Sequence, residues 1–194
     1  AIKHPTWTMG KKISVDSSTM MNKGLEIIEA KVLFNLELQN INAIIHRQSK
    51  VHALVEFFDG TTIAHMSHPD MRIPISYALT FPQRLYVSSE NNFEYKDISF
   101  EEISHERYPC YSLAREVAKI GKNSGLILNA ANEISVEYFL RDKIMYTDIP
   151  KIIREIIDTS EIVRNDSVES ILDNDFQVRN LTRELIQEKY GINK

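Results

Sequence analysis

The chain has 194 residues, with 23 lysine and arginine residues against 27 aspartate and glutamate residues, and a formal net charge of -4 at pH 7. The lack of a net positive charge argues against a nucleic-acid-binding protein and against a polybasic membrane-binding surface. No apolar run approaches the roughly 20 residues that span a bilayer. The single cysteine, Cys110, cannot form an internal disulfide, which fits a reducing compartment. We therefore expect a cytoplasmic protein, with a plastid-type organelle as the alternative.

A chain of this length can hold one large domain or two small ones. The first residues, from Ala1 to Pro5, contain neither an initiating methionine nor an apolar signal sequence. We therefore interpret the chain as an internal segment of a longer protein.

The first predicted element is a helix that ends near Phe34. The polar residues 16–19 supply N-cap candidates for it. Its apolar positions recur at helical spacing: Met21, Leu25, Ile28 and Val32.

A small antiparallel sheet is predicted next, with strands at residues 41–46, 51–58 and 61–66. Asp59-Gly60 is a dipeptide that favours a two-residue hairpin turn. The strand from Val51 to Phe58 is apolar on both faces, which predicts a homodimer formed through the sheet. Pro74 fits the first turn of a short helix, which ends before Pro82.

The remainder of the chain predicts a linker followed by helices. Residues 83–108 are polar and aperiodic, with room for one additional strand. Four helices are predicted after Pro109, at residues 113–120, 126–140, 149–157 and 167–190. The third would be capped by Thr147 or Asp148, and the fourth could be broken near Asn174. These elements predict an α+β fold, in which a small sheet with flanking helices (1–82) and a linker (83–108) precede a C-terminal four-helix bundle (109–194).

The segment from Gly10 to Glu29 has the features of an anion-binding helix N-terminus. Lys23 in the first turns of a helix opposes the helix dipole at a cost of about 0.3–1 kcal/mol, and Gly24 costs about 1 kcal/mol relative to alanine. A bound phosphate would explain both, because helix N–H groups, the Ser17 hydroxyl, the Asn22 amide and the Lys23 ammonium could converge on it. Gly24 would then allow close approach of the ligand. An ordinary capped helix with a solvated lysine is the alternative, and both interpretations stay open.

Glu26 is a candidate metal ligand on the same helix. It lies four residues after Asn22 and three before Glu29, opposite the apolar positions. A carboxylate one turn beyond a phosphate site could bind Mg²⁺ or Mn²⁺, which prefer oxygen ligands and often use few carboxylates together with substrate oxygens. The alternative is an ordinary glutamate on a helix surface, because the sequence shows no evident partner carboxylates.

Two segments carry a resemblance to a known enzyme family. Residues 4–10 (His-Pro-Thr-Trp-Thr-Met-Gly) and residues 16–26 (Asp-Ser-Ser-Thr-Met-Met-Asn-Lys-Gly-Leu-Glu) resemble the signature of the 1-deoxy-D-xylulose 5-phosphate reductoisomerases. Further segments agree in order: 45–46, 51–52, 69–75, 107–110 and 128–133. The resemblance therefore covers the whole chain.

The resemblance implies roles for individual residues at the start of the chain. Glu26 would be a catalytic residue and one of three acidic metal ligands. Ser17, Asn22, Lys23 and His4 would hold the phosphorylated sugar.

Residues 4–11 resemble the mobile flap of the family, which closes over the substrate. Trp7 would cover the carbon chain of the sugar, and Met9 would seal the site beside it. Gly10 would let the backbone approach the cofactor. Met71, together with Pro69, resembles residues beside the nicotinamide.

The implied enzyme uses NADPH and Mn²⁺ or Mg²⁺. The metal would polarise the ketone of 1-deoxy-D-xylulose 5-phosphate and organise a rearrangement, and NADPH would reduce the product to 2-C-methyl-D-erythritol 4-phosphate. This is a step of non-mevalonate isoprenoid biosynthesis. The family resemblance also implies a homodimer, with residues 1–82 as part of a catalytic and dimerisation domain.

The sequence also departs from the family. A glycine-rich strand-to-helix turn is not evident among the six glycines, and the acidic cluster that supplies two of the three metal ligands is absent. We therefore expect the C-terminal half of such an enzyme, inactive alone. The rival interpretation is a non-catalytic dimerisation or interaction module. A glycine-rich nucleotide fold and an acidic motif upstream would favour the enzyme, whereas a start codon at this point would favour the module.

Two further groups of polar residues are not assigned to the chemistry. The histidines lack zinc-type spacing, and we expect them to be strand and loop residues: His46, His52, His65 and His68. Residues 129–133 are predicted to make structural hydrogen bonds within a helix.

Overall fold

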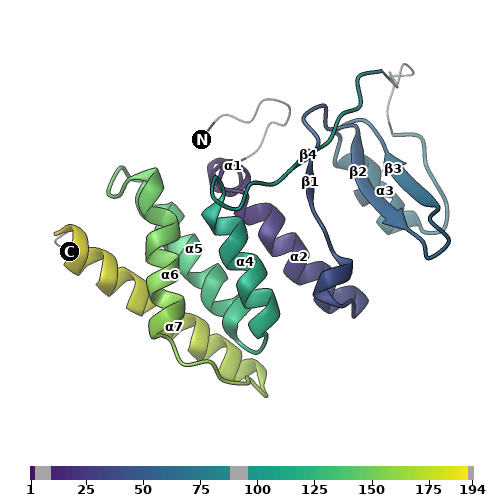
Figure 1. Cartoon of the computed structure of the whole chain (residues 1–194). Coiled ribbons are helices and arrows are strands. Elements are labelled where there is room, and N and C mark those ends of the chain that lie inside the picture. The colour runs from purple at the N-terminus through teal and green to yellow at the C-terminus, as the bar shows by residue number, and fades with distance from the viewer. Residues whose placement is uncertain (3–9, 88–95, 192–194) are drawn as a thin grey trace. The chain divides into compact units, whose positions relative to one another are not determined.

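The computed structural model describes residues 1–2, 10–87 and 96–191. The described residues form two compact units, one of residues 1–2, 10–43 and 103–191 and the other of residues 44–87 and 96–102. The first unit is helical and the second contains the strands (Figure 1). This combination confirms the predicted α+β class.

Helices build the first unit: α1 (Lys11–Ser18), α2 (Met21–Phe34), η1 (Leu38–Asn40), α4 (Pro109–Ile120), α5 (Ser124–Leu140), η2 (Tyr146–Asp148), α6 (Ile149–Thr159) and α7 (Val168–Tyr190). The four helices predicted after Pro109 are thus confirmed. Helix α7 continues without a break past Asn174, and the Ser167 hydroxyl caps its start by accepting a hydrogen bond from the Ser170 N–H at 3.1 Å. Among the described residues, none of the helices combines the length and hydropathy that a membrane-spanning helix requires.

Residues 16–19 do not cap a helix as predicted, because most of them belong to α1, a helix that the sequence analysis missed. Aspartate and serine favour helix ends, yet Ser14, Val15 and Asp16 are buried in α1. Helix α1 packs on α2 and α5, so tertiary packing outweighs the local preference of these residues.

Helix α2 is confirmed, but its buried face differs from the predicted one. Met21, Gly24 and Ile27 are buried, and Leu25 and Ile28 are partly buried against the core. Val32, the last of the predicted apolar positions, is 72% exposed. The buried positions end before the last turns of the helix, and the periodic pattern alone could not show this.

One apolar core joins the helices of the first unit. It takes Val15 from α1 and Met21 from α2, together with residues of α4, α5, α6 and α7. Helix α6 shows most clearly why these helices pack together, because its apolar residues recur at helical spacing and form one buried face: Ile149, Ile152, Ile153, Ile156 and Ile157. Helices α1 and α2 therefore share a core with the helices after residue 108. The domain assignment to residues 1–82, 83–108 and 109–194 itself stays a prediction.

The second unit contains two antiparallel strand pairs and one helix. Strand β1 (Ile44–Ile45) pairs with β4 (Glu101–Glu102), and β2 (Val51–Glu56) pairs with β3 (Thr62–Met66). Helix α3 (Arg72–Thr80) contains Pro74 in its first turn, as predicted. Strand β1 is shorter than predicted, and β4 is the additional strand expected within residues 83–108.

The turn of the β2–β3 hairpin is wider than the predicted two-residue turn. The Phe57 N–H donates to the Thr61 carbonyl at 2.9 Å, and the Gly60 N–H donates to the Phe57 carbonyl at 2.9 Å. Gly60 has a φ of +85°, which glycine adopts without steric cost. The glycine of the Asp-Gly pair is thus essential, although the loop is longer than its sequence suggested.

The contact at Gly24 yields a stability prediction. A Cβ atom on Gly24 would lie 2.4 Å from the Cβ of Ala114 in α4. We expect Gly24→Ala to destabilise the chain by up to about 2 kcal/mol, because an overpacking cost of about 1–3 kcal/mol outweighs the gain in helix propensity of about 1 kcal/mol. Urea denaturation followed by circular dichroism measures the change.

Gly125→Ala is the matched control. Its Cβ would meet only the Ile28 Cγ2 at an ordinary 3.6 Å, so this variant should be as stable as the parent or more stable. Equal stability of the two variants would contradict the account of the α2–α4 contact.

Candidate functional site

The connection between α1 and α2 redirects the chain within two residues. The Thr19 N–H donates to the Val15 carbonyl at 2.9 Å, and the Met20 N–H donates to the Ser17 carbonyl at 3.2 Å. Met20 has a φ of +60° and makes no side-chain cap for α2. The last turn of α1, with Ser17, therefore directly adjoins the first turn of α2.

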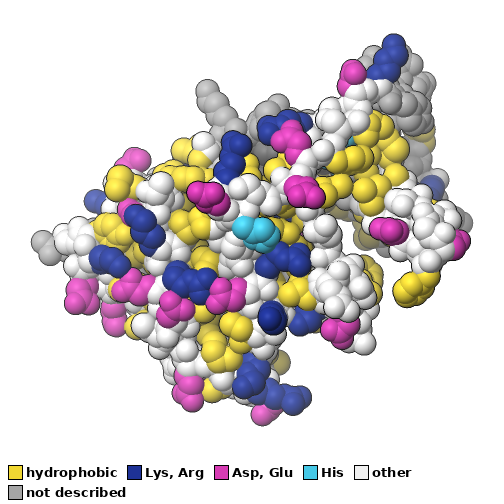
Figure 2. Space-filling view, viewed as in Figure 1, with side chains coloured by type: hydrophobic (Ala, Val, Ile, Leu, Met, Phe, Trp, Pro, Cys, Tyr) yellow, Lys and Arg dark blue, Asp and Glu magenta, His cyan; other side chains and the backbone are white. Residues whose placement is uncertain are grey.

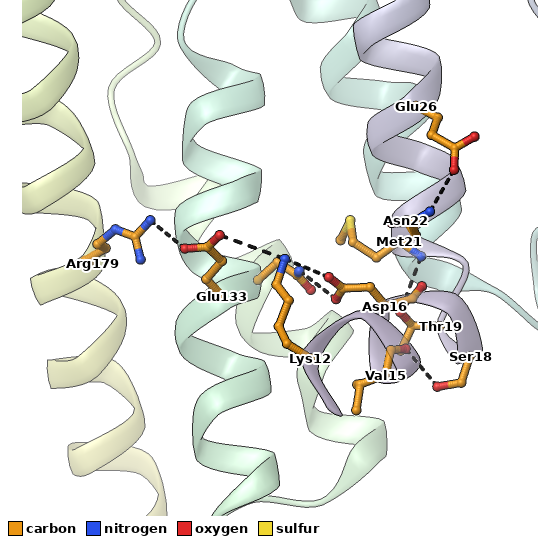
Figure 3. Close-up of polar contacts among 11 residues, drawn as sticks. Lys12, Val15, Asp16, Ser18, Thr19, Met21, Asn22, Glu26, Glu133 and Arg179 are labelled. Atoms are coloured by element: carbon orange, nitrogen blue, oxygen red, sulfur yellow. Dashed lines mark hydrogen bonds and ion pairs between the residues drawn. The ribbon is translucent and has the colours of Figure 1, made fainter. Parts of the chain in front are cut away.

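Three of the predicted site residues meet on the first turns of α2. The Asn22 amide donates to Glu26 Oε1 at 2.7 Å, and the Lys23 ammonium donates to Glu26 Oε2 at 2.6 Å. Figure 3 shows Asn22 and Glu26 one turn apart on α2. The Lys23 and Glu26 side chains are 39% and 47% exposed. Both carboxylate oxygens of Glu26 are thus engaged, and the group remains accessible to a ligand.

The structure changes the argument for Gly24. Gly24 is buried against Ala114, where a side chain would clash, so helix packing explains why a glycine stands here. Close approach of a phosphate is not needed to account for it. Lys23 is likewise paired with Glu26 rather than simply solvated. The case for an anion site therefore depends on Lys23, Asn22 and the N–H groups at the start of α2, of which that of Met21 already donates to the Thr19 hydroxyl at 3.3 Å.

Asp16 lies directly behind the turn and was not among the predicted site residues. It is 1% exposed, and Lys12 Nζ contacts its Oδ2 at 2.8 Å. The Asn132 amide of α5 donates to its Oδ1 at 2.9 Å. This contact confirms the structural hydrogen bonding predicted for residues 129–133. The sequence feature that could have pointed to Asp16 is its position next to Ser17, in the segment that resembles the family signature.

Ion pairs extend this cluster to α7. Lys12 Nζ lies 3.8 Å from Glu133 Oε1, and Arg179 Nη2 contacts Glu133 Oε2 at 2.7 Å. Arg179 also contacts Asp175 at 2.6 Å, and these carboxylates raise the pKa of Arg179 above its usual value. Figure 3 shows Lys12 reaching toward both Asp16 and Glu133.

Tyr146 contacts the same turn from η2. Its hydroxyl donates to Ser18 Oγ at 3.2 Å. Burial raises the pKa of Tyr146, so the phenol stays protonated and can keep donating at neutral pH. The turn is therefore held by side chains of both α5 and η2.

The remaining predicted site residues are distributed as follows. His4, Trp7 and Met9 lie outside the described residues. Gly10 is the N-cap of α1, and a Cβ there would have no neighbour within 4 Å, which is compatible with close approach of a ligand. Met71, predicted beside the cofactor, precedes α3 in the second unit and is 57% exposed.

A hard divalent cation fits the carboxylate of Glu26, which is exposed and offers oxygen ligands. Within residues 1–2, 10–87 and 96–191, no group of three or more histidine, cysteine, aspartate or glutamate residues is arranged to hold a metal. A cation at Glu26 would need additional ligands, and the positive charge of the neighbouring Lys23 ammonium would oppose its binding.

Polar groups at the start of a helix, beside an accessible carboxylate, are typical of enzymes that bind phosphorylated substrates and metals. Family comparison agrees. The DXP reductoisomerase C-terminal domain matches residues 66–181, and the 1-deoxy-D-xylulose 5-phosphate reductoisomerase C-terminal domain matches residues 1–34. The chain belongs to the DXP reductoisomerase family.

Individual relatives support this assignment. The chain is 44% identical over 193 residues to the 1-deoxy-D-xylulose 5-phosphate reductoisomerase of Pelotomaculum thermopropionicum, covering 98% of this chain and 50% of the relative. It is 46% identical over 189 residues to that of Wigglesworthia glossinidia brevipalpis, covering 96% and 48%. The chain thus spans about half the length of the curated relatives it matches.

Solved structures agree with the fold. DOX-P reductoisomerase in complex with NADPH, fosmidomycin and magnesium matches with a TM-score of 0.89 and 40% identity, covering 96% of this chain and 48% of that one. The Zymomonas mobilis enzyme in complex with NADPH matches with a TM-score of 0.86 and 38% identity, covering 91% and 47%.

Proposed function

We propose that this chain is the C-terminal catalytic region of a cytoplasmic enzyme that converts 1-deoxy-D-xylulose 5-phosphate to 2-C-methyl-D-erythritol 4-phosphate. The observation that carries the proposal is the cluster of Asn22, Lys23 and Glu26 at the start of α2, in a chain of this family. The solved relatives were obtained with NADPH and with magnesium. This supports a dependence of the whole enzyme on NADPH and on Mg²⁺ or Mn²⁺.

In this proposal the residues of the α1–α2 turn bind the phosphate group of the sugar. Ser17, Asn22 and Lys23 offer a hydroxyl, an amide and an ammonium group, and the start of α2 adds N–H groups. Holding the distant end of the substrate helps to align its reacting carbons. His4, with Trp7 and Met9 above the sugar, would complete this part of the site.

Glu26 is proposed as the metal ligand and catalytic residue of this chain. The bound metal would supply a Lewis acid that polarises the substrate ketone. Lys23 would then move from Glu26 to the phosphate. The ion pair between Lys23 and Glu26 at 2.6 Å would be replaced by one contact of Lys23 with the phosphate and one of Glu26 with the metal. Gly10 and Met71 are proposed to lie beside NADPH.

A non-catalytic dimerisation module is the second candidate function. The β2–β3 hairpin supports dimerisation as a role in addition to the enzymatic one. Its apolar side chains are exposed at 42–57%: Leu54, Val55, Phe57 and Ile63. Exposed apolar strands are commonly covered by another chain. We therefore propose a homodimer through this hairpin.

Light scattering should give twice the mass of one chain, and a monomer at high protein concentration would refute the dimer.

Phosphate binding by the 194-residue chain tests the proposed site directly. On titration with inorganic phosphate, backbone amide shifts should centre on residues 17–23, because the polar groups are local in sequence. The shifts should shrink in Lys23→Ala and persist in Lys119→Ala, which removes an exposed lysine from α4. Shifts centred elsewhere, or an unchanged response of Lys23→Ala, would show that α2 begins with an ordinary helix end.

Glu26→Gln tests the catalytic role in a complete enzyme that contains this chain. We expect kcat/KM to fall by at least about 100-fold, since loss of even an outer-shell partner costs about 10–100-fold. Thermal stability should hardly change, because exposed ion pairs contribute at most about 1 kcal/mol. Glu29→Gln, on the same exposed side of α2, should keep normal turnover.

Near-normal turnover of Glu26→Gln at saturating Mn²⁺ would contradict the assignment. We also propose that the 194-residue chain assayed alone oxidises no NADPH above a metal-only blank, because Glu26 would lack partner ligands.

A further inference from the structure

Asp16 and Asn132 form a buried polar contact between two helices that are remote in sequence. Asp16 is 1% exposed and Asn132 is fully buried, and the Asn132 Nδ2 donates to the Asp16 Oδ1 at 2.9 Å. A buried carboxylate is costly unless it is paired and hydrogen-bonded. Asn132 and Lys12 together meet this need.

The orientation of the Asn132 side chain costs free energy, because it leaves one of its polar atoms without a hydrogen bond. An ionised carboxylate only accepts hydrogen bonds, so Asn132 must turn its NH₂ group toward Asp16. Its Oδ1 is then buried with no hydrogen-bond partner among the residues that the structure describes, which is unfavourable. Apolar residues of similar size could fill such a position with equal or better stability. The polar pair does, however, hold the Asp16 side chain in one defined orientation.

Hydrogen bonds connect the backbone of Asp16 to the start of α2. The Thr19 hydroxyl donates to the Asp16 carbonyl at 3.2 Å and accepts from the Met21 N–H at 3.3 Å. Asn132 is therefore linked to the first N–H of α2 through Asp16 and Thr19. Figure 3 shows Asp16, Thr19 and Met21 in sequence, with Asn22 and Glu26 following on α2.

We propose that Asn132 of α5 and Asp16 of α1 are positioning residues for the ligand site. By fixing the α1–α2 turn, they hold Ser17, Asn22 and Lys23 in the arrangement that binds the phosphate group. The binding role rests on the function proposed above, whereas the effect on the turn can be measured without a ligand. Lys12, which is partly exposed, contacts both Asp16 and Glu133 and adds an ionic contact to the Asp16–Asn132 hydrogen bond.

A swap of the two side chains tests the proposal. Asn132→Asp places two carboxylates at hydrogen-bond distance and should displace the turn. The double variant Asp16→Asn with Asn132→Asp restores an amide-to-carboxylate hydrogen bond in the opposite direction, and Lys12 keeps Glu133 as an ionic neighbour. Amide shifts of residues 19–23 in the ligand-free chain, phosphate Kd from NMR titration and the melting temperature are measured for each.

Asn123→Asp is the matched control. Asn123 is also a buried asparagine, 3% exposed, but it bonds to the Glu161 carbonyl and to Asn174. Its substitution should lower the melting temperature while the amide shifts of residues 19–23 and the phosphate Kd stay as in the parent. It therefore reports what loss of stability alone does to the turn.

We expect Asn132→Asp to shift the amides of residues 19–23 and to weaken phosphate binding by about 10-fold, and the double variant to recover both. Unchanged amide shifts in Asn132→Asp, or no recovery of them in the double variant, would overturn the proposal.

If Asn132→Asp does not fold, the double variant decides: parent-like amide shifts support the proposal, and an unfolded or displaced turn overturns it. If the parent binds no phosphate, the phosphate site fails, and the amide shifts still decide the positioning role.

Discussion

The close contact of α2 with α4 at Gly24 is the constraint on which the site depends. A helix repeats about every 3.6 residues, so burying Met21, Gly24 and Ile27 turns Asn22, Lys23 and Glu26 away from the core. The missing side chain at Gly24 lets the two helices approach to a distance that a Cβ atom would prevent. One face of α2 thus packs in the core, and the other presents the residues proposed to bind the ligand.

The site also depends on the helices that follow it by about a hundred residues. Asn132 and Tyr146 contact Asp16 and Ser18, respectively. Helix α5 and the short helix η2 thus contact the end of α1 next to the α1–α2 turn, where the proposed ligand-binding residues lie. Over the face shown in Figure 2, acidic and basic side chains are interspersed rather than collected into one basic surface. This mixture of charges agrees with the proposal that an anion is bound by local groups such as Lys23.

The sequence predicted most helices because their apolar residues recur at helical spacing, as the isoleucines of α6 do. It failed at α1, where aspartate and serine indicate a helix end and only tertiary packing shows otherwise. The local contacts of Asn22 and Lys23 with Glu26 were predictable, since the residues lie three and four apart on one helix. The contact of Asp16 with Asn132 was not, because no local rule relates residues 116 positions apart. The packing role of Gly24 was missed for the same reason.

The central claim is that the exposed face of α2 carries a metal ligand one turn beyond a phosphate site. A crystal structure of the complete enzyme with Mn²⁺, analysed by anomalous scattering, tests it most directly. The account predicts an anomalous peak about 2–2.2 Å from a carboxylate oxygen of Glu26, the range for a small divalent cation, with Lys23 turned away from it. A fully occupied Mn²⁺ site in which Glu26 remains paired with Lys23 would contradict the account.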